Sequence, residues 1–142
     1  MIITSKNNPK IKRFRSFKDR VPSKEKEYFC IEGTHLLEEL IKSELTPSEL
    51  IATEEWISKN QKIIEKLDTS LISIVSREAL TSSITTKSPD GVATLVKTSE
   101  IKQFNYQKNN NFVLVLDRVQ DPGNLGNLFR TALAGGVDGV LL

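Results

Sequence analysis

The residues best suited to chemistry lie near the C-terminal end of the chain, between Asp121 and Arg130. A turn-forming Asp-Pro-Gly sequence begins at Asp121, and Asn124 follows it at the position expected of a helix N-cap. Helical side chains lean towards the helix N-terminus, so Arg130 must pass over Gly126, four residues earlier. Gly126 removes the obstruction, and the guanidinium can then approach the helix N-terminus, where free N–H groups favour an anion. The spacing predicts a small polar pocket for a phosphate or a ribose-phosphate unit.

The same residues admit two readings of this pocket. In the first, Arg130 and Asn124 contact the ligand, while Asp121, Pro122 and Gly126 shape the backbone around it. In the second, Arg130 pairs with a local carboxylate such as Asp121, and Asn124 only caps the helix. Geometry alone leaves the two even.

Two strands and a helix must position these residues. Residues 112–116 are a short apolar run, as expected of a strand buried on both faces. The apolar stripe of the following helix consists of Leu125, Leu128, Phe129, Ala132 and Leu133. Glycines at 135–136 supply a left-handed stop, and residues 137–142 begin a second strand. Residues 112–142 therefore form a β-loop-α-β unit that we expect to need a parallel neighbour and a cover.

Basic side chains are concentrated at the other end of the chain. Residues 1–26 hold nine Lys and Arg against two acidic residues, whereas the remainder holds eleven basic and sixteen acidic residues, for a net charge of +2. This asymmetry predicts a polyanionic partner, with a solvated lysine-rich helix as the alternative. The predicted nucleic-acid contacts are Lys6, Lys10, Lys12, Arg13, Arg15 and Lys18, and Arg20, Lys24 and Lys26 complete the basic arm.

Composition restricts the protein class. The hydrophobic fraction of 38% and charged fraction of 27% fit a soluble globular protein. No apolar run is long enough to cross a bilayer, so no membrane partner is expected. One cysteine, Cys30, fits a reducing cytoplasm and predicts an inert core thiol, and one Cys with one His excludes a structural zinc site; no metal is expected. Glu32 is predicted to make a structural hydrogen bond rather than to act as an acid.

Between the two ends, short strands alternate with helices. Asn8 is predicted to cap a helix that begins at Pro9, with Ile11, Phe14 and Phe17 as core anchors. The further elements expected are strands at 28–31, 50–53, 70–75 and 91–97, a helix capped by Thr34 and ending at Lys42 that buries Leu36, Leu37, Leu40 and Ile41, a helix at 54–67, and a helix capped by Ser76 and ending near Leu80.

This alternation predicts a small α/β sandwich as the first domain. Residues 98–111 are polar and lack clear periodicity, so they are the predicted linker. The predicted organisation is an α/β domain at 1–97, a linker at 98–111 and the start of a second domain at 112–142.

The segment from Leu116 to Ala132 closely resembles the first motif of the SpoU (TrmH-like) RNA ribose 2′-O-methyltransferases, D-x-V-x-D-P-x-N-x-G-x-x-x-R-T-A, at every fixed position. Residues 8–12, 29–33 and 89–92 resemble the substrate-binding domain that often precedes it, which is similar to ribosomal proteins that bind kinked RNA. The resemblance implies an RNA-binding α/β sandwich followed by the first β-α-β unit of a parallel-sheet SPOUT-type methyltransferase domain, truncated before its knot.

The resemblance also implies an activity. Family members transfer methyl from S-adenosylmethionine to a ribose 2′-hydroxyl of rRNA or tRNA, with Arg130 and Asn124 as the matching catalytic positions. We expect Arg130 to position the hydroxyl and stabilise charge rather than to act as a base, because its guanidinium stays protonated. The family pattern also implies a homodimer when the protein is full length, and the single cysteine fits a cytoplasmic location.

The motifs that hold S-adenosylmethionine in this family would lie after Leu142. We therefore expect residues 1–142 alone neither to bind the cofactor tightly nor to methylate RNA. One competing hypothesis is a stand-alone, non-catalytic RNA-binding module formed by residues 1–97, and a third is the opening β-α-β unit of another nucleotide-binding domain.

Overall fold

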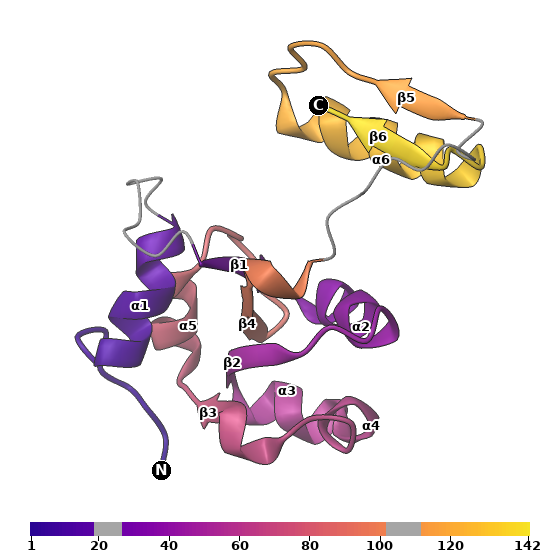
Figure 1. Cartoon of the computed structure of the whole chain (residues 1–142). Helices are drawn as coiled ribbons and strands as arrows, with labels where there is room; N and C mark the ends of the chain where they lie inside the picture. The colour runs from indigo at the N-terminus through magenta and orange to yellow at the C-terminus, as the bar shows by residue number, and fades with distance from the viewer. Residues whose placement is uncertain (19–26, 102–111) are drawn as a thin grey trace. The chain divides into compact units, whose positions relative to one another are not determined.

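A computed structural model describes residues 1–18, 27–101 and 112–142, which fall into two compact units, Met1–Ile101 and Lys102–Leu142 (Figure 1). The division falls within the segment 98–111, of which residues 102–111 lie outside the described residues. The elements of the first unit are α1 (Pro9–Lys18), β1 (Tyr28–Glu32), α2 (Thr34–Lys42), β2 (Pro47–Ala52), α3 (Glu54–Lys59), α4 (Gln61–Ile64), η1 (Thr69–Leu71), β3 (Ile72–Ile74), α5 (Arg77–Ser83), β4 (Val92–Lys97) and η2 (Thr98–Glu100).

A four-stranded mixed sheet of order β1-β4-β2-β3 forms the centre of the N-terminal unit. β4 runs antiparallel to both of its neighbours, and β2 pairs with β3 in parallel. Residues of β4 alternate between the two faces, so Ala93 and Leu95 join one core while Val92 and Val96 join the other. The central strand is thus buried on both faces.

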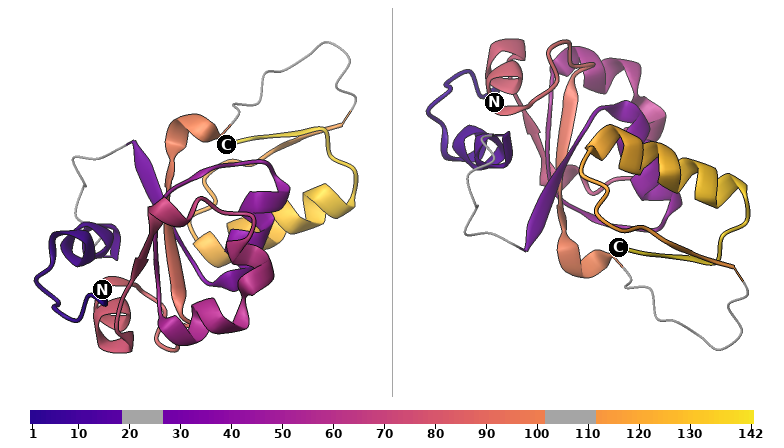
Figure 2. Two further views of the ribbon diagram at one scale, coloured as in Figure 1. Left: turned by 90° about the horizontal axis from the view of Figure 1, so that it is seen from below. Right: turned by 90° about the horizontal axis from the view of Figure 1, so that it is seen from above.

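Helices cover both faces of this sheet, as the two views of Figure 2 show. On one face α1 and α5 pack over a core made of Ile11, Phe14, Ile51, Val75, Ala79, Leu80, Ile84, Ala93 and Leu95. On the other face α2, α3 and α4 pack over Leu37, Leu40, Leu50, Ala52, Trp56, Ile63, Val92 and Val96. The predicted α/β sandwich is confirmed, with three layers.

The start of α1 follows the sequence prediction. The Asn8 side-chain oxygen accepts a hydrogen bond from the backbone N–H of Lys10 at 2.9 Å, and Pro9 occupies the first helical position. Ile11 and Phe14 are fully buried, and Phe17 packs partly against the same core. The apolar residues of α1 therefore attach it to the sheet and leave its basic residues on the remaining surface.

The start of α2 differs from the sequence prediction because residues distant in sequence contact it. The predicted cap, Thr34, is wrong: Gly33 is the N-cap residue, with φ +98°, and makes no side-chain cap. The Thr34 hydroxyl instead donates to the Asp90 carboxylate at 2.5 Å and accepts from Trp56 Nε1 at 2.8 Å. A second expectation also fails on this helix, since Leu36 is 48% exposed while Leu37 and Leu40 are buried.

The predicted helix at 54–67 is broken into α3 and α4 at Asn60. Asn60 has φ −122° and ψ 38°, outside the helical region, and its side-chain amide donates to the Trp56 carbonyl at 2.8 Å. This local side-chain bond replaces a helical backbone bond and ends the first segment. The third strand is also shorter than predicted, because η1 takes its first residues, whereas Ser76 caps α5 as expected.

The C-terminal unit contains β5 (Val113–Val115), α6 (Pro122–Ala134) and β6 (Gly139–Leu141). β5 and β6 pair in parallel, from Val113 opposite Gly139 to Val115 opposite Leu141, so the predicted β-loop-α-β unit is confirmed. Gly136 has φ +72°, the left-handed conformation expected after the helix. Much of the apolar surface stays exposed: Phe112, Val115, Phe129, Leu133, Leu141 and Leu142 are all at least 39% exposed.

Candidate functional site

The N-terminus of α6 is built by Asp121 rather than by Asn124. Asp121 is the N-cap, its Oδ1 accepts from the backbone N–H of Asn124 at 2.7 Å, and Pro122 occupies the first helical position. The prediction that Asn124 is the cap is therefore wrong, because the Asp-Pro pair already meets both requirements of a helix start. Asn124 lies in the first turn of the helix, and its side chain is exposed.

Gly126 and Arg130 lie one turn apart on α6. A Cβ built on Gly126 would meet no atom within 4 Å, so the surface beside it is open. Arg130 is exposed, and among the described residues it makes no hydrogen bond or ion pair with Asp121. Open space over Gly126 leaves room for the predicted approach of the Arg130 guanidinium to the positive end of the helix dipole.

The predicted basic contacts of the N-terminal unit divide into structural and free groups. Arg13 makes an ion pair with Glu49, and its guanidinium lies over the Tyr28 ring at 4.7 Å from the ring centre. Both partners sit on strands of the sheet, so Arg13 attaches α1 to β1 and β2.

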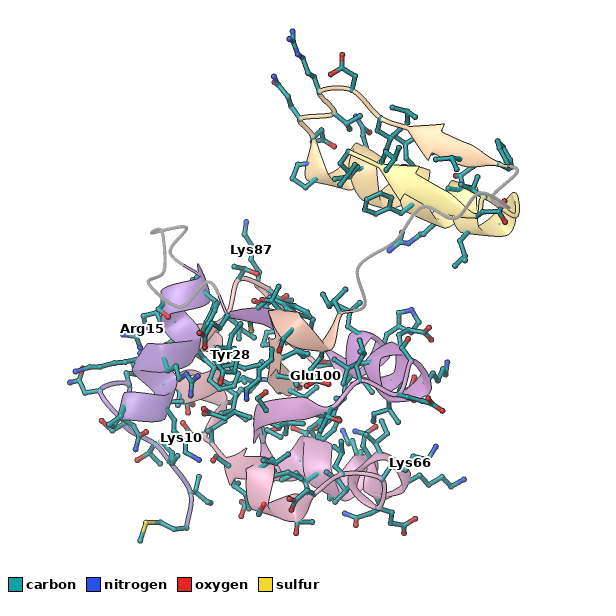
Figure 3. All side chains as sticks on the ribbon, in the orientation of Figure 1. Lys10, Arg15, Tyr28, Lys66, Lys87 and Glu100 are labelled. Atoms are coloured by element: carbon teal, nitrogen blue, oxygen red, sulfur yellow. The ribbon has the colours of Figure 1, made fainter. Side chains whose placement is uncertain are left out.

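Arg15 is also structural. Its Nε and Nη2 donate to the carbonyl and hydroxyl of Ser82, each at 3.1 Å, and Nη2 also donates to the Lys6 carbonyl at 3.0 Å. These bonds connect α1, α5 and the segment before α1. Figure 3 shows Arg15 and Lys10 on this side of the unit.

The lysines of the basic arm are more available. Lys6, Lys12 and Lys18 are exposed, and Lys10 is exposed while donating to the Ser73 hydroxyl at 2.7 Å. Arg20, Lys24 and Lys26 lie outside the described residues. The exposed lysines therefore form the described cationic surface, and the two arginines support the helix that presents it.

Arg77 is a basic residue that the sequence reasoning missed. It lies at the start of α5, and with Lys6, Glu78, Thr81 and Ser82 it lines a surface hollow of about 410 Å³. No local sequence signal places Lys6 beside α5. The one sequence signal for Arg77 was its position directly after the Ser76 cap, because the first residue of a helix is often exposed.

Two carboxylates line a second hollow, of about 300 Å³, beyond the ends of β1 and β4. Glu32 accepts four hydrogen bonds of 2.6–2.8 Å from the backbones and hydroxyls of Thr85 and Thr86. Burial raises the pKa of Glu32, but these hydrogen bonds outweigh it and lower the pKa below the ordinary value. Asp90 accepts from the backbone and hydroxyl of Thr34. The structural role predicted for Glu32 is confirmed.

The thiol of Cys30 is not activated for chemistry. Burial, followed by the nearby charge of Glu32, raises the pKa of the Cys30 thiol to about 12, so it stays protonated and unreactive. Across residues 1–18, 27–101 and 112–142, no three His, Cys, Asp or Glu side chains gather as a metal site would need. In the same residues no helix has the length and apolar character required to cross a membrane.

Known proteins resemble this chain along almost its whole length. Residues 8–94 match the MRM3-like substrate binding domain. The chain is 36% identical over 144 residues to an uncharacterized tRNA/rRNA methyltransferase of Synechocystis sp., a match covering 99% of this chain and 52% of that protein. It is 33% identical over 141 residues to the 23S rRNA (guanosine(2553)-2′-O)-methyltransferase RlmP of Bacillus subtilis, covering 99% and 53%.

The fold has solved counterparts. A crystal structure of an RNA 2′-O ribose methyltransferase superposes with a TM-score of 0.79 and 26% identity, over 99% of this chain and 54% of that one. The chain spans about half the length of the curated relatives it matches. Because the family match covers most of the chain, the protein belongs to the MRM3-like substrate-binding domain family, and its relatives named above are RNA methyltransferases.

Proposed function

We propose that this chain is the RNA-binding domain and first catalytic segment of an RNA methyltransferase that modifies a ribose 2′-hydroxyl of rRNA or tRNA. The observation that carries the proposal is the substrate-binding domain match at 8–94, continued by alignment of the whole chain to RNA methyltransferases. The exposed lysines of the basic arm supply the cationic surface that RNA requires. A homodimer and a cytoplasmic location belong to the same proposal.

The α6 site is assigned to the acceptor ribose. A 2′-hydroxyl is a weak nucleophile, so positioning and stabilisation of developing charge carry much of the rate. We assign Arg130 to the phosphate beside the ribose, with the Asn124 amide holding the same nucleotide. Because a guanidinium remains protonated, Arg130 acts through charge and orientation, not as the general base.

S-adenosylmethionine is the proposed methyl donor, supplying an electrophilic methyl group when bound. Residues 112–142 fit the acceptor side better than the cofactor side: Asn124 and Arg130 are exposed polar groups, whereas an adenine ring needs a concave, largely apolar site. We therefore propose that the cofactor contacts lie in the part of the relatives that this chain does not match.

A second candidate is a stand-alone RNA-binding module. It is favoured by the difference between the two units: Met1–Ile101 has a core on both sheet faces, whereas the C-terminal unit leaves Leu133 82% exposed. In this alternative residues 1–97 bind RNA and the α6 residues have no catalytic role.

RNA binding by the 142-residue chain tests the shared part of both proposals. Fluorescence anisotropy with a labelled rRNA hairpin should give an affinity that falls steeply with salt, because bound lysines displace counterions. The triple variant K6A/K12A/K18A should bind more weakly, with a log–log salt slope reduced by up to about 3. An affinity independent of salt and of these lysines would contradict the basic arm as the RNA contact.

Methylation separates the two candidates. In a protein that carries the whole sequence of its relatives, Arg130→Ala should abolish methyl transfer to RNA even at RNA concentrations that saturate binding. The 142-residue chain alone should show no micromolar binding of S-adenosylmethionine by isothermal titration. Unchanged methyl transfer by Arg130→Ala would remove α6 from the reaction.

A further inference from the structure

The hollow between the N-terminal segment and α5 combines charge and shape in a way that the basic arm alone does not. Its volume is about 410 Å³, and its lining consists of Lys6, Arg77, Glu78, Thr81 and Ser82. We call it the α5 hollow. Its walls thus carry two cations, one carboxylate and two hydroxyls. The side chains of Lys6 and Arg77 come from segments about seventy residues apart in sequence, which the fold brings together.

The backbone around the hollow is fixed on both sides. Ile3 donates to the Ile74 carbonyl at 2.8 Å and accepts from the backbone N–H of Ser76 at 2.9 Å, which attaches the chain start to the residues preceding α5. Arg15 then joins the Lys6 carbonyl to Ser82 through hydrogen bonds of 3.0 and 3.1 Å. Arg15 is therefore a positioning residue that holds the two walls together.

The hydroxyls of the hollow are already used as donors. Thr81 donates to the Arg77 carbonyl at 2.9 Å, and Ser82 donates to the Ala79 carbonyl at 2.7 Å. A ligand would therefore find its free donors on the Lys6 ammonium and the Arg77 guanidinium. The Arg77 side chain is 61% exposed, and its one ion pair among the described residues joins it to Glu55 at 3.8 Å, so the guanidinium can turn towards a ligand.

Glu78 opposes those cations. Hydrogen bonds from its own backbone N–H and from Ser76 lower the pKa of Glu78, and the charges of Lys6 and Arg77 lower it further. Both cations thus act on the same carboxylate across the hollow. The local balance is one excess positive charge, in contrast to the hollow beside Glu32 and Asp90, where two carboxylates repel an anion.

We propose that the α5 hollow binds a backbone phosphate of RNA, with Lys6 and Arg77 contacting it from two sides and Glu78 limiting its affinity. This inference rests on the proposed RNA-binding function and adds a defined phosphate site with Arg77, a residue outside the basic arm. A guanidinium and an ammonium that line one polar hollow suit the two non-bridging oxygens of a phosphodiester, which share one negative charge. The opposing carboxylate keeps the contact weak and exchangeable, as sequence-independent phosphate contacts are.

The test uses the 142-residue chain and a labelled rRNA hairpin at two salt concentrations. K6A and R77A should each weaken binding by roughly three- to tenfold, and R77K should recover part of the loss. E78Q should tighten binding severalfold, because it removes a repulsive charge while keeping the side-chain shape. K66A is the matched control, since Lys66 is an exposed lysine near α4, on the other face of the sheet (Figure 3).

The outcomes separate this inference from the function on which it rests. If the unmodified chain binds the hairpin but K6A and R77A bind equally well, or if K66A loses as much as they do, the α5 hollow is not a phosphate site. An E78Q affinity that stays unchanged or falls would also overturn it. If the unmodified chain fails to bind RNA even at low salt, the proposed function itself fails. Unchanged thermal unfolding of each variant shows that the losses are not losses of fold.

Discussion

Replacing Gly91 with alanine tests how closely the residue before β4 packs against Thr53 and Trp56 at the start of α3. Gly91 has φ +121°, and a Cβ built on it would lie 2.7 Å from Trp56 Cβ and 2.8 Å from Thr53 Oγ1. Neither neighbour can withdraw easily, because Trp56 is 2% exposed and its indole N–H is hydrogen-bonded to Thr34. The substitution must therefore strain the backbone and crowd the core at once.

The two costs can be estimated separately. A non-glycine residue at this φ costs about 1–3 kcal/mol, and overpacking a closed core costs about 1–3 kcal/mol. We expect Gly91→Ala to lower the free energy of unfolding by about 2–6 kcal/mol, a large part of the 5–15 kcal/mol typical of a domain. Urea unfolding followed by the fluorescence of Trp56, the single tryptophan of the chain, reports directly on this unit.

Two other glycines are matched controls for the same change. Gly33 has φ +98°, but a Cβ there would meet Asp90 only at 3.6 Å, so Gly33→Ala should show the backbone cost alone, about 1–3 kcal/mol. Gly126 lies inside α6, in the unit that does not contain Trp56, so Gly126→Ala should leave the Trp56 unfolding curve unchanged and stabilise α6 by about 0.5–1 kcal/mol. A Gly91→Ala protein within about 0.5 kcal/mol of the unmodified chain would refute the reasoning.

Other predictions concern buried and titrating groups. The Thr94 hydroxyl is buried and has no partner among the described residues, so Thr94→Val should raise the free energy of unfolding by about 1 kcal/mol. Thr53→Val removes the cap of α3 and should lower the free energy of unfolding by a similar amount. Urea titrations of both variants measure these changes. The folded-state pKa of Glu32 lies below its ordinary value of 4.5, so its stabilisation is complete above that pH and is lost as the pH falls through the folded pKa. Unfolding titrations should therefore show a flatter acid dependence in Glu32→Gln, and an unchanged profile would contradict the assignment. Cys30 should resist iodoacetamide at pH 8 in the folded chain and react once the chain is unfolded in urea, as mass spectrometry can follow.

Local sequence signals were sufficient where short-range chemistry decides the structure. Asn8-Pro9 fixed the start of α1, Ser76 the start of α5, and the glycines at 135–136 the end of α6. Each of these depends on a cap, a ring or a left-handed backbone within a few residues. A single helix connects β5 to β6, and such a crossover makes the two strands parallel, so their relative direction was predictable from local signals.

Long-range partners decided what the sequence could not predict. Thr34 is a residue type that often caps helices. Its hydroxyl is instead hydrogen-bonded to Asp90 and Trp56, which lie 56 and 22 residues away in sequence. Arg15 carried the same basic signal as its neighbours, and only the fold revealed Ser82, 67 residues distant, as its partner. For the candidate site, the sequence supplied the α6 residues and the lysines, but the pairing of Lys6 with Arg77 depends on the folded sheet.

The position of β4 has a consequence for synthesis on the ribosome. It is the last strand of the N-terminal unit to be made, yet it lies between β1 and β2. Until residue 97 has left the ribosome, β1 cannot pair with β4. The apolar residues of the two cores likewise lack β4, the strand that lies between them. This unit can therefore fold only after nearly all of its residues have been synthesised. Until then the nascent chain exposes unpaired strand edges that are prone to aggregate.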